Sequence, residues 1–498
     1  MFSAPRADLV ANTAAYENEP LVKATGFREY DARWLFGPEI NLLGVQALGL
    51  GLGTYIHELG QSKIVVGHDF RSYSTSIKNA LIIGLLSAGC EVHDIGLALS
   101  PTAYFAQFDL DIPCVAMVTA SHNENGWTGV KMGAQKPLTF GPDEMSRLKA
   151  IVLGAQFVER DGGKLIRVQG EAQRYIDDVA KRASVTRPLK VIAACGNGTA
   201  GAFVVEALQK MGVADVVPMD TDLDFTFPKY NPNPEDAEML HAMAHTVRET
   251  GADLAFGFDG DGDRCGVVDD EGEEIFADKI GLMLARDLAP LNPGATFVVD
   301  VKSTGLYATD PILQQHGCKV IYWKTGHSYI KRKSAELKAL AGFEKSGHFF
   351  MNGDLGYGYD CGLTAAAAIL AMLDRNRGMK LSDMRKALPV AFTSLTMSPK
   401  CGDEVKYGVV DEVVKEYQDL FAAGGRVLGR KITEVITVNG VRVHLEDGSW
   451  VLVRASSNKP EVVVVVESTQ SEDDMRALFR QEVKPRLGDR VGKYNQEI

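Results

Sequence analysis

Three stretches of the chain repeat one pattern: an apolar run, a small polar turn that contains glycine, and a helical segment. They are KIVVGHDFRSYS at residues 63–74, LKVIAACGNGTAG at 189–201 and ATFVVDVKSTG at 295–305. An apolar run that gives way to a helical period after such a turn is typical of the first strand and helix of a parallel sheet. The pattern therefore predicts three regions of related α/β topology.

A second apolar strand follows each repeat at a broadly similar distance and ends in a polar loop. These segments are CVAMVTASHN at 114–123, LAFGFDGDGDR at 254–264 and ALAGFEKSGH at 339–348. In open α/β sheets, ligands bind beyond the carboxyl ends of the strands. If the three regions face one another, we expect all three loops to line one cleft.

The last hundred residues follow a different pattern, in which apolar and polar positions alternate. Turn signals at Asn439-Gly440 and Asp447-Gly448 divide the alternation into the strands of an antiparallel meander. A helix is expected from about Ser471, a suitable N-cap residue. The predicted fold is α/β: three related α/β domains with mixed sheets plus a C-terminal α+β domain. The predicted boundaries are 1–170, 171–275, 276–393 and 394–498.

Composition narrows the class of protein. The 498 residues carry a formal net charge of -12, which argues against a general binder of nucleic acid or anionic membranes. The longest apolar run, at about 363–373, is shorter than the roughly 20 residues of a membrane span. The first 20 residues lack the features of a signal peptide. Seven scattered cysteines without a CxxC pair predict neither a zinc site nor a disulfide framework. A cytoplasmic protein is expected.

The segment Asp259-Gly260-Asp261-Gly262-Asp263-Arg264 is the strongest chemical signal. Glycine lets the backbone fold tightly, so the three carboxylates can converge. A hard divalent cation such as Mg²⁺, bound together with a phosphate, would relieve their mutual repulsion. The alternatives are a solvated acidic turn and a calcium loop, although the EF-hand glutamate position is occupied by Asp270.

Ser121 is a candidate nucleophile. It follows an apolar strand within Thr119-Ala120-Ser121-His122-Asn123, and a serine at a strand end can be activated by its neighbours. Taken alone the signal is weak, because exposed Ser-His pairs in turns are common. The segment does not match the G-x-S-x-G elbow of serine hydrolases. Lys131 adds a group that could transfer a proton or neutralise a phosphate, although most lone lysines are simply solvated.

Two further polar loops suit phosphosugar binding. The segment at 344–348, EKSGH, offers a carboxylate and a hydroxyl for sugar hydroxyls, and the segment at 454–460, RASSNKP, offers an arginine that can grip a phosphate with two hydrogen bonds. Each could equally be a polar loop without function. The glycines at 49, 51 and 53 do not fit the dinucleotide fingerprint, and no P-loop occurs.

Taken together and in this order, the loops resemble the α-D-phosphohexomutase superfamily. The matching segments run from about residue 27 to residue 467 and are FREYDAR, GHDFR, TASHN with GVK, ACGNGTAG, FDGDGDR, WKTGHSYIK, EKSGH and RASSNKP. The WKTGHSYIK and EKSGH segments are most similar to the bacterial phosphomannomutase/phosphoglucomutase branch. Positions that depart from the branch include Glu124 for a common proline, Lys345 for methionine or glutamine, and Lys459 where threonine usually stands nearby.

The resemblance implies a heart-shaped enzyme of four domains around a central cleft. It implies that domain I carries the catalytic serine, domain II the metal loop, domain III the sugar-binding loop and domain IV the phosphate-binding loop. The implied catalytic residues are Ser121, His122, Lys131 and Arg264. The implied metal ligands are Ser121, Asp259, Asp261 and Asp263. The implied substrate-binding residues are Tyr30, Arg33, Lys324, His327, Glu344, Ser346, His348, Arg454, Ser456, Ser457 and Asn458.

The resemblance also implies the reaction. Phosphorylated Ser121 would give its phosphoryl group to a hexose 1-phosphate of glucose or mannose, and the 1,6-bisphosphate would turn round and return the other phosphoryl group. The implied cofactors are Mg²⁺ and, as activator, glucose 1,6-bisphosphate or mannose 1,6-bisphosphate. The expected partner is a small phosphosugar, with no nucleic acid, membrane or protein partner implied.

Three alternatives stay open at this point: a phosphoglucosamine mutase, a non-catalytic phosphosugar-binding relative, and a phosphatase. A cation at Lys345 argues against a charged amino sugar, and intact Ser121 argues against a non-catalytic relative.

Overall fold

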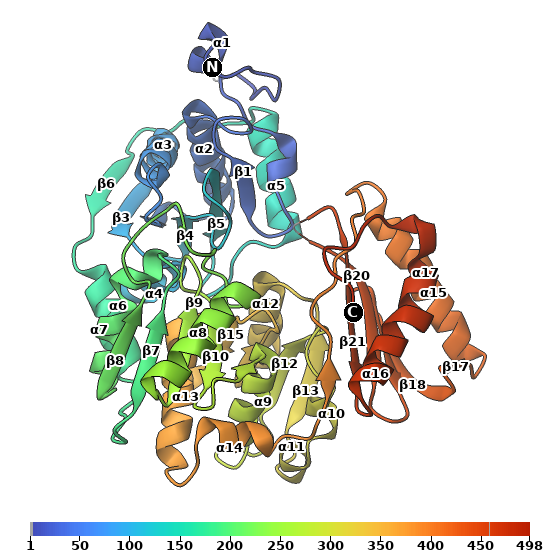
Figure 1. Cartoon of the computed structure of the whole chain (residues 1–498). Coiled ribbons are helices and arrows are strands. Elements are labelled where there is room, and N and C mark those ends of the chain that lie inside the picture. The colour runs from blue at the N-terminus through green and yellow to red at the C-terminus, as the bar shows by residue number, and fades with distance from the viewer. Residues whose placement is uncertain (1–2, 458) are drawn as a thin grey trace. The chain divides into compact units, whose positions relative to one another are not determined.

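The computed structural model describes residues 3–457 and 459–498 (Figure 1). These residues form two compact units. The first unit contains residues 3–277 and 346–382, and the second contains residues 278–345 and 383–498. The chain therefore leaves the first unit and later returns to it. Among the described residues all seven cysteines are free, and six of them are buried. None of the described helices combines the length and apolar content that a membrane span requires.

The first sheet of the first unit is mixed. Its strand order is β1-β5-β4-β2-β3-β6, in which β4, β2, β3 and β6 run parallel to one another, while β5 pairs antiparallel with both β4 and β1. The strands are β1 (Ala32–Leu35), β2 (Lys63–His68), β3 (Glu91–Leu97), β4 (Cys114–Val118), β5 (Trp127–Gly133) and β6 (Lys164–Arg167). The predicted first strand and helix are confirmed, because β2 leads into α3.

Helices pack against the first sheet and against one another. Three of them, α2 (Leu42–Glu58), α3 (Ser74–Ser87) and α5 (Pro142–Leu153), enclose the main apolar core, and α4 (Ser100–Asp109) contacts β2 and β4. A Cβ at Gly49 of α2 would lie 2.2 Å from the backbone oxygen of Leu81 in α3. This glycine therefore serves close helix packing, which agrees with the rejection of a dinucleotide-binding motif at this place.

The second sheet repeats the arrangement of the first. Its order is β11-β10-β9-β7-β8, with β9, β7 and β8 parallel and β10 and β11 antiparallel. The strands are β7 (Lys190–Ala194), β8 (Asp215–Met219), β9 (Leu254–Phe258), β10 (Cys265–Asp269) and β11 (Glu274–Ile275), and the helices are α6 (Glu171–Ala180), α7 (Val204–Lys210) and α8 (Ala237–Thr250). In both sheets the third strand of the parallel core is followed by a polar loop and an antiparallel strand.

An aromatic cluster joins three segments of the first unit. We call residues 346–382, with which the chain comes back to the first unit, the returning segment. Aromatic rings of α4, of α6 and of this segment meet at centroid distances between 4.6 and 6.3 Å. The cluster consists of Phe105, Phe108, Tyr175, Tyr357 and Tyr359. The returning segment also contributes β15 (Phe349–Met351) and α13 (Gly362–Arg375), the buried alanine-rich helix that the sequence predicted. Aromatic packing of this kind ties residues that are distant in sequence into one core.

The second unit combines a parallel sheet with the C-terminal antiparallel sheet. Strand β12 (Thr296–Asp300) pairs in parallel with β13 (Lys319–Trp323) and β14 (Ala341–Phe343).

The strand order of the C-terminal sheet is β16-β21-β20-β19-β18-β17, antiparallel throughout. Its strands are β16 (Phe392–Thr393), β17 (Arg426–Val427), β18 (Arg430–Ile436), β19 (Val441–Leu445), β20 (Trp450–Ala455) and β21 (Val462–Ser468), and its helices are α15 (Lys406–Ala422), α16 (Glu472–Ala477) and α17 (Lys484–Leu487). The other helices are α1 (Ala14–Asn18), α9 (Ala277–Leu288), α10 (Leu306–Thr309), α11 (Pro311–Gln315), α12 (His327–Leu337) and α14 (Leu381–Lys386).

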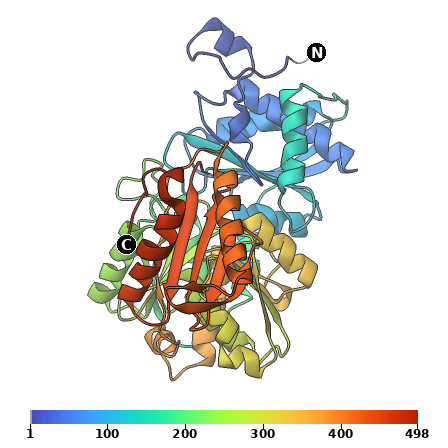
Figure 2. The ribbon, with the colours of Figure 1, turned by 90° about the vertical axis from the view of Figure 1, so that its right-hand side faces the viewer.

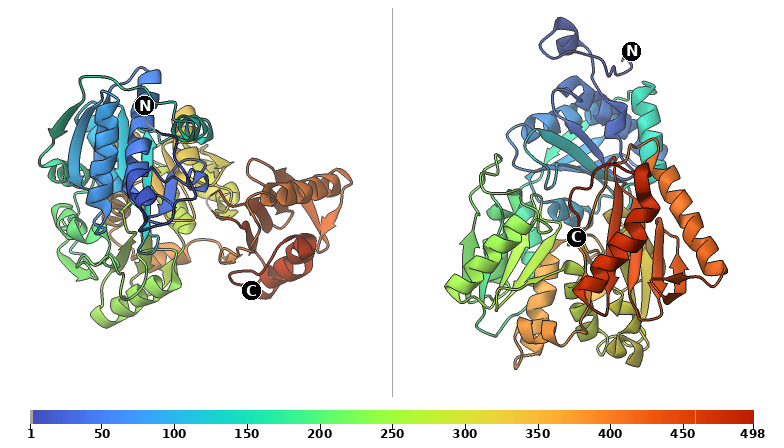
Figure 3. Two further views of the ribbon diagram at one scale, coloured as in Figure 1. Left: turned by 90° about the horizontal axis from the view of Figure 1, so that it is seen from above. Right: turned by 45° about the vertical axis from the view of Figure 1, so that its right-hand side comes forward.

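The C-terminal sheet is covered on both faces. Figure 2 shows orange α15 and red α16 together on one side of the sheet, and the right panel of Figure 3 shows the same arrangement. On the other face, Trp450, Leu452 and Val465 pack with Val301 at the end of β12. The predicted meander and its two turns are confirmed, and Ser471 caps α16 by accepting a hydrogen bond from the Asp474 amide.

Candidate active site

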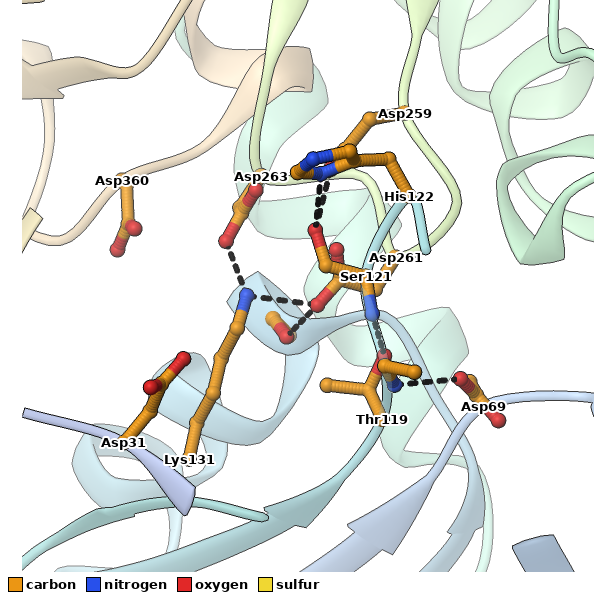
Figure 4. A network of polar contacts seen from close by, with 12 residues as sticks. Asp31, Asp69, Thr119, Ser121, His122, Lys131, Asp259, Asp261, Asp263 and Asp360 are labelled. Carbon is orange, nitrogen blue, oxygen red and sulfur yellow. Dashed lines mark hydrogen bonds and ion pairs between the residues drawn. The ribbon is translucent and has the colours of Figure 1, made fainter. Parts of the chain in front are cut away.

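Two loops in equivalent places meet in the first unit. The serine loop (residues 119–126) joins β4 to β5, and the metal loop (residues 259–264) joins β9 to β10. The Oγ atom of Ser121 donates a hydrogen bond to Oδ2 of Asp259 at 2.9 Å, and it lies 3.2 Å from Nδ1 of His122 (Figure 4). Ser121 is 2% exposed. The fold thus brings a buried hydroxyl against the acidic loop.

Ser121 has an unusual backbone conformation. Its φ is +53°, in the left-handed region that few residues other than glycine adopt. Its amide donates to Oγ1 of Thr119 at 2.9 Å. A Cβ at Gly260 would lie 2.3 Å from the Ser121 carbonyl oxygen, so only glycine lets the two loops pack this closely.

The three aspartates of the metal loop form a compact acidic group. Asp259, Asp261 and Asp263 are fully buried and offer oxygens that lie within 4.8 Å of one another. Burial and repulsion by the other two carboxylates raise the pKa of Asp259 well above its usual value. Neither Oδ1 of Asp261 nor Oδ1 of Asp263 accepts a hydrogen bond among the described residues, although Oδ1 of Asp263 lies 3.4 Å from Nε2 of His348. Such buried oxygens fit a hard divalent cation, which takes oxygen ligands and offsets their charge.

Lys131 extends from β5 into the acidic group. Its ammonium donates to Asp261 at 2.7 Å and also to Asp263 (Figure 4). Burial opposes the charged ammonium, but the two carboxylates raise the pKa of Lys131 well above its usual value. For Asp261, burial and Asp263 oppose ionisation, yet Lys131 and Ser100 lower its pKa. Lys131 therefore stays cationic and keeps this carboxylate ionised.

The returning segment adds His348 and Ser346 to the same site. Ser346 Oγ lies 3.0 Å from Nδ1 of His348, and Nε2 of His348 lies 3.4 Å from both Nε of Arg264 and Oδ1 of Asp263. Arg264 also donates its backbone amide to Asp259 at 3.2 Å. Asp360 lies 3.9 Å from His348 and is fully buried. An imidazole, a guanidinium and a hydroxyl thus border the acidic group.

The FREYDAR segment near the N-terminus, at residues 27–33, also contacts the serine loop. Arg33 is fixed by Asp31 at 2.8 Å, and its Nη1 donates to the Ala120 carbonyl at 3.3 Å. Tyr30 is buried on the same segment. The residues from the sequence prediction that lie in the first unit are Tyr30, Arg33, Ser121, His122, Lys131, Asp259, Asp261, Asp263, Arg264, Ser346 and His348.

The remaining predicted residues lie in the second unit. Glu344 accepts a hydrogen bond from the Gly326 amide. Asn439 accepts from the Thr325 amide and from Nη1 of Arg454, each at 3.2 Å. This part of the prediction comprises Lys324 and Ser457, which are half-buried, and His327, Glu344, Arg454 and Ser456, which are buried. The two hydrogen bonds of Asn439 connect the loop that precedes α12 with Arg454 near the end of β20. Helix α12 begins at His327. Asn458 lies outside the described residues.

The position of Lys345 bears on one argument made from the sequence. The side chain is 6% exposed, and its ammonium donates to the Ser394 backbone oxygen at 3.1 Å. Burial lowers its pKa. Lys345 is thus engaged by the chain itself, and the expectation that its charge disfavours an amino sugar stays a prediction.

Sequence reasoning missed several residues that hold the site together. Arg71 donates to the Ser121 carbonyl at 3.0 Å and pairs with Asp69, and the Ser100 amide donates to the Asp261 carbonyl at 2.9 Å. Arg71 and Asp69 belong to the GHDFR segment directly after β2. Their place at the carboxyl end of a central strand was the available signal, because ligand sites collect there.

Comparison with known proteins gives one consistent result. Four family models match in order: phosphoglucomutase/phosphomannomutase alpha/beta/alpha domain I at residues 24–159, domain II at 173–272, domain III at 276–392, and the C-terminal domain at 404–484. A phosphomannomutase/phosphoglucomutase of Pseudomonas putida is 31% identical over 93% of this chain and 96% of its own length. A phosphoglucomutase of Neisseria meningitidis is 30% identical over 89% and 92%. The crystal structure of a phosphoglucomutase/phosphomannomutase family protein from Burkholderia thailandensis superposes with a TM-score of 0.83 at 29% identity, covering 94% of this chain and 99% of that one.

Proposed function

Because the chain belongs to the phosphoglucomutase/phosphomannomutase family, we propose that it interconverts hexose 1-phosphates and hexose 6-phosphates of glucose, mannose or both. The observation that carries the proposal is the contact of the buried Ser121 hydroxyl with Asp259 in the acidic group. A serine in this setting can carry a phosphoryl group, because the surrounding cations offset the added negative charge.

In the proposed reaction Ser121 exchanges phosphoryl groups with the sugar. Phosphorylated Ser121 gives its phosphoryl group to the free hydroxyl of a hexose 1-phosphate, which leaves a hexose 1,6-bisphosphate and a serine hydroxyl. After the bisphosphate turns round, Oγ of Ser121 loses its proton and attacks the phosphorus at the sugar O1. The bond between that phosphorus and O1 breaks, O1 gains a proton, and hexose 6-phosphate leaves while Ser121 is phosphorylated again. Asp259 Oδ2 at 2.9 Å and His122 Nδ1 at 3.2 Å are the groups placed to take the proton of Ser121.

Positive side chains of the first unit favour the transfer. Lys131, Arg264 and Arg33 border the serine and its acidic group, where they can stabilise charge that develops on the transferring phosphoryl group. His348 lies beside Arg264 and can take the proton of the attacking sugar hydroxyl. We assign catalysis to Ser121, His122, Lys131 and Arg264, and substrate contact to Tyr30, Arg33, Ser346 and His348.

We propose that Asp259, Asp261, Asp263 and Ser121 hold Mg²⁺, which fits the buried oxygens of the acidic group that accept no hydrogen bond among the described residues. When bound, the ion supplies positive charge against the transferring phosphoryl group. Glucose 1,6-bisphosphate or mannose 1,6-bisphosphate is the proposed activator, since it would phosphorylate Ser121 before the first turnover.

The second unit is proposed to recognise the sugar and the phosphate that is not reacting. Glu344 supplies a carboxylate for sugar hydroxyls, and Arg454 supplies a guanidinium for phosphate, with Lys324, His327, Ser456, Ser457 and Asn458 in supporting roles. The domain boundaries 1–170, 171–275, 276–393 and 394–498 and a cytoplasmic location remain part of the proposal.

An isomerisation assay tests the proposed function. Purified protein with Mg²⁺ and a trace of glucose 1,6-bisphosphate is given glucose 1-phosphate or mannose 1-phosphate, and both 6-phosphate and inorganic phosphate are measured. We expect 6-phosphate to form without a matching release of inorganic phosphate. The Ser121→Ala variant should lose more than about 1,000-fold in rate while keeping its circular dichroism spectrum, because it has no group to carry the phosphoryl.

The outcomes separate the alternatives. Release of inorganic phosphate without formation of the isomer would indicate a phosphatase instead of a mutase. If only glucosamine phosphate is isomerised, the substrate is an amino sugar phosphate. Inertness toward all three sugars, with retained binding, would favour a non-catalytic phosphosugar-binding protein.

A further inference from the structure

The left-handed turn at Ser121 needs support from its surroundings. A non-glycine residue at a φ of +53° lies in a sparsely populated region of backbone conformation, so the turn is strained. The conformation directs Oγ toward Asp259. A relaxed backbone would rotate Oγ away, so the groups that hold this turn decide whether the serine is ready to react.

Arg71 is the main such group. Its side chain is 1% exposed and lies just beyond the end of β2. Its Nη2 donates to the carbonyl of Ser121 at 3.0 Å and to the carbonyl of Asn123 at 2.6 Å. One guanidinium therefore bridges the two carbonyls on either side of His122. Hydrogen bonds from a charged donor are stronger than neutral ones, and the planar fork fixes their geometry.

Asp69 fixes Arg71 and contacts the serine loop as well. Its carboxylate pairs with Nη1 of Arg71 and accepts from the Arg71 amide at 3.2 Å, while the Ser74 hydroxyl donates to it. Oδ2 of Asp69 also accepts from the Ala120 amide at 3.3 Å, a contact visible in Figure 4. Asp69 and Arg71 thus hold the loop by an amide before Ser121 and by carbonyls at and after it.

We propose that Arg71, oriented by Asp69, is a positioning residue that keeps Ser121 in its reactive conformation. This inference rests on the proposed function, because it assumes that Ser121 carries the phosphoryl group. The Arg71 side chain donates hydrogen bonds to Asp69 and to backbone oxygens of the loop, none of them a reacting atom. Arg71 therefore acts on phosphoryl transfer through Ser121.

The consequence is a loss of rate rather than of substrate binding. Without Arg71 two carbonyls of the turn lose their donor, and the loop can relax from the left-handed conformation. A small misplacement of a reacting group can lower a rate by about 100-fold. The residues proposed to bind the sugar and the distal phosphate do not contact Arg71 among the described residues. The substrate KM should therefore change little.

The test compares Arg71→Ala, Arg71→Lys and wild type. We measure kcat and KM for glucose 1-phosphate and, by intact mass, the rate at which glucose 1,6-bisphosphate phosphorylates Ser121. Arg71→Ala should lower both kcat and the phosphorylation rate by about 100-fold and change KM by less than about threefold. Added guanidinium ion at non-denaturing concentration should restore part of both rates, a recovery that general destabilisation would not give.

Arg71→Lys keeps the positive charge and is the variant for the case in which Arg71→Ala does not fold. A single ammonium cannot match the fork that reaches Asp69 and two carbonyls, so we expect kcat to fall by about 10-fold, again with KM nearly unchanged. A kcat within threefold of wild type in either folded variant would overturn the inference. So would an increase in KM that accounts for the whole loss.

Lys78 provides the matched control. It is a buried cation of the same domain and pairs with Asp94 at 2.7 and 2.8 Å, away from the serine loop. Lys78→Met should lower thermal stability and leave kcat near wild type. A loss of kcat equal to that of Arg71→Ala would overturn the inference, because any broken buried pair would then have the same effect. A wild type that neither isomerises the sugar nor becomes phosphorylated would instead overturn the proposed function and this inference with it.

Discussion

The hydrogen atom on the α-carbon of residue 260 decides how closely the two reactive loops approach. The Ser121 carbonyl occupies the space that a Cβ at this position would fill, at 2.3 Å. The contact is part of what brings Ser121 within hydrogen-bond distance of Asp259. Distances in the site therefore depend on a residue that has no chemistry of its own.

Gly260→Ala tests this dependence. We expect a loss of about 1–3 kcal/mol in the free energy of unfolding, because overpacking forces the backbone to shift, together with a clear loss of mutase activity. Urea unfolding and the isomerisation assay measure the two effects. Gly378→Ala is the control, since no atom lies within 4 Å of its added Cβ, and it should behave as wild type. Full activity in Gly260→Ala would show that the close approach is dispensable.

At the scale of residues, the side chains that meet in the candidate site were easier to find from the sequence than the groups that hold them. Ser121 and the three aspartates stand in a recognisable order of motifs. Arg71 and Ser100 act through contacts with residues 50 and 161 positions away, and no local pattern encodes such a distance. Their roles follow from sheet topology, because β2 and β4 are neighbours whose carboxyl ends meet.

Strand β19 shows how a polar strand face becomes part of a core. Arg442 is fully buried, donates to the carbonyls of Val301 and Ser303, and stacks on Trp450 with its guanidinium carbon 3.7 Å from the ring centroid. The alternation of apolar and polar residues along β19 suggests that one face of the strand is exposed to solvent. Residues directly after β12 cover that face instead, so the cation is stabilised by carbonyls and an aromatic ring.

Arg442→Met should lower the free energy of unfolding by about 2–4 kcal/mol, because it leaves two buried carbonyls without a donor and removes the stacking. Chemical denaturation followed by tryptophan fluorescence measures the change. Arg426→Met, at an exposed arginine of β17, serves as the comparison and should be close to neutral. Equal stability of the two variants would contradict the buried role of Arg442.

His444 makes the same sheet sensitive to acid. Burial and the neighbouring Arg442 lower its pKa to about 3, and its Nε2 accepts a hydrogen bond from Arg442 at 2.9 Å. The unfolded chain takes up a proton near pH 6.5 whereas the folded chain does so only near pH 3. Stability conferred by the neutral imidazole is therefore complete above about pH 6.5 and falls as the pH is lowered toward 3.

His444→Gln should weaken this acid sensitivity. Between pH 7.5 and pH 5.0 the variant should lose less stability than wild type, by at most about 2 kcal/mol, since glutamine accepts a hydrogen bond without titrating. Urea unfolding at both pH values gives the comparison. Identical losses in both proteins would mean that other groups cause the acid sensitivity.

At the scale of elements, hydrophobic periodicity predicted the strands and the two hairpin turns of the C-terminal sheet. It did not predict the short strands β16 and β17, which contain only Phe392–Thr393 and Arg426–Val427. Two-residue strands carry too few positions for a period. Their pairing depends on the long strands beside them.

For the molecule as a whole, magnesium is expected to contribute both activity and stability. Removal of metal with EDTA should abolish isomerisation, and added Mg²⁺ should restore it. At a concentration about 100-fold above its Kd, Mg²⁺ should stabilise the folded protein by about 2.7 kcal/mol. A thermal shift assay without substrate measures this effect independently of catalysis.

Asp261→Asn should remove the thermal shift, because it replaces one carboxylate of the acidic group. Asp143→Asn, at an exposed position of α5, is the control and should keep the shift. A normal shift in Asp261→Asn would place the ion elsewhere.

The division of the chain into its two units was the feature that could least be predicted from the sequence. Three repeats predicted three α/β domains, and the family match agrees. The repeat gave no sign that residues 346–382 pack with the first unit. That packing depends on the rings of Tyr357 and Tyr359 against α4 and on the hydrogen bond from the Tyr357 hydroxyl to Asp178 of α6, and neither tyrosine belongs to a motif.

The return of the chain to the first unit determines when the residues around the acidic group become available during synthesis on the ribosome. Ser121 emerges long before His348 and Asp360, which border its acidic group. At about 5–20 residues per second, the roughly 240 residues from Ser121 to Asp360 take about 10–50 s to be translated. Only the last part of that time, the roughly 97 residues from Asp263 to Asp360 or about 5–20 s, passes with the acidic group already made but still uncovered. A prematurely terminated polypeptide would consequently be inert, and it would be a natural client for chaperones that shield unfinished surfaces.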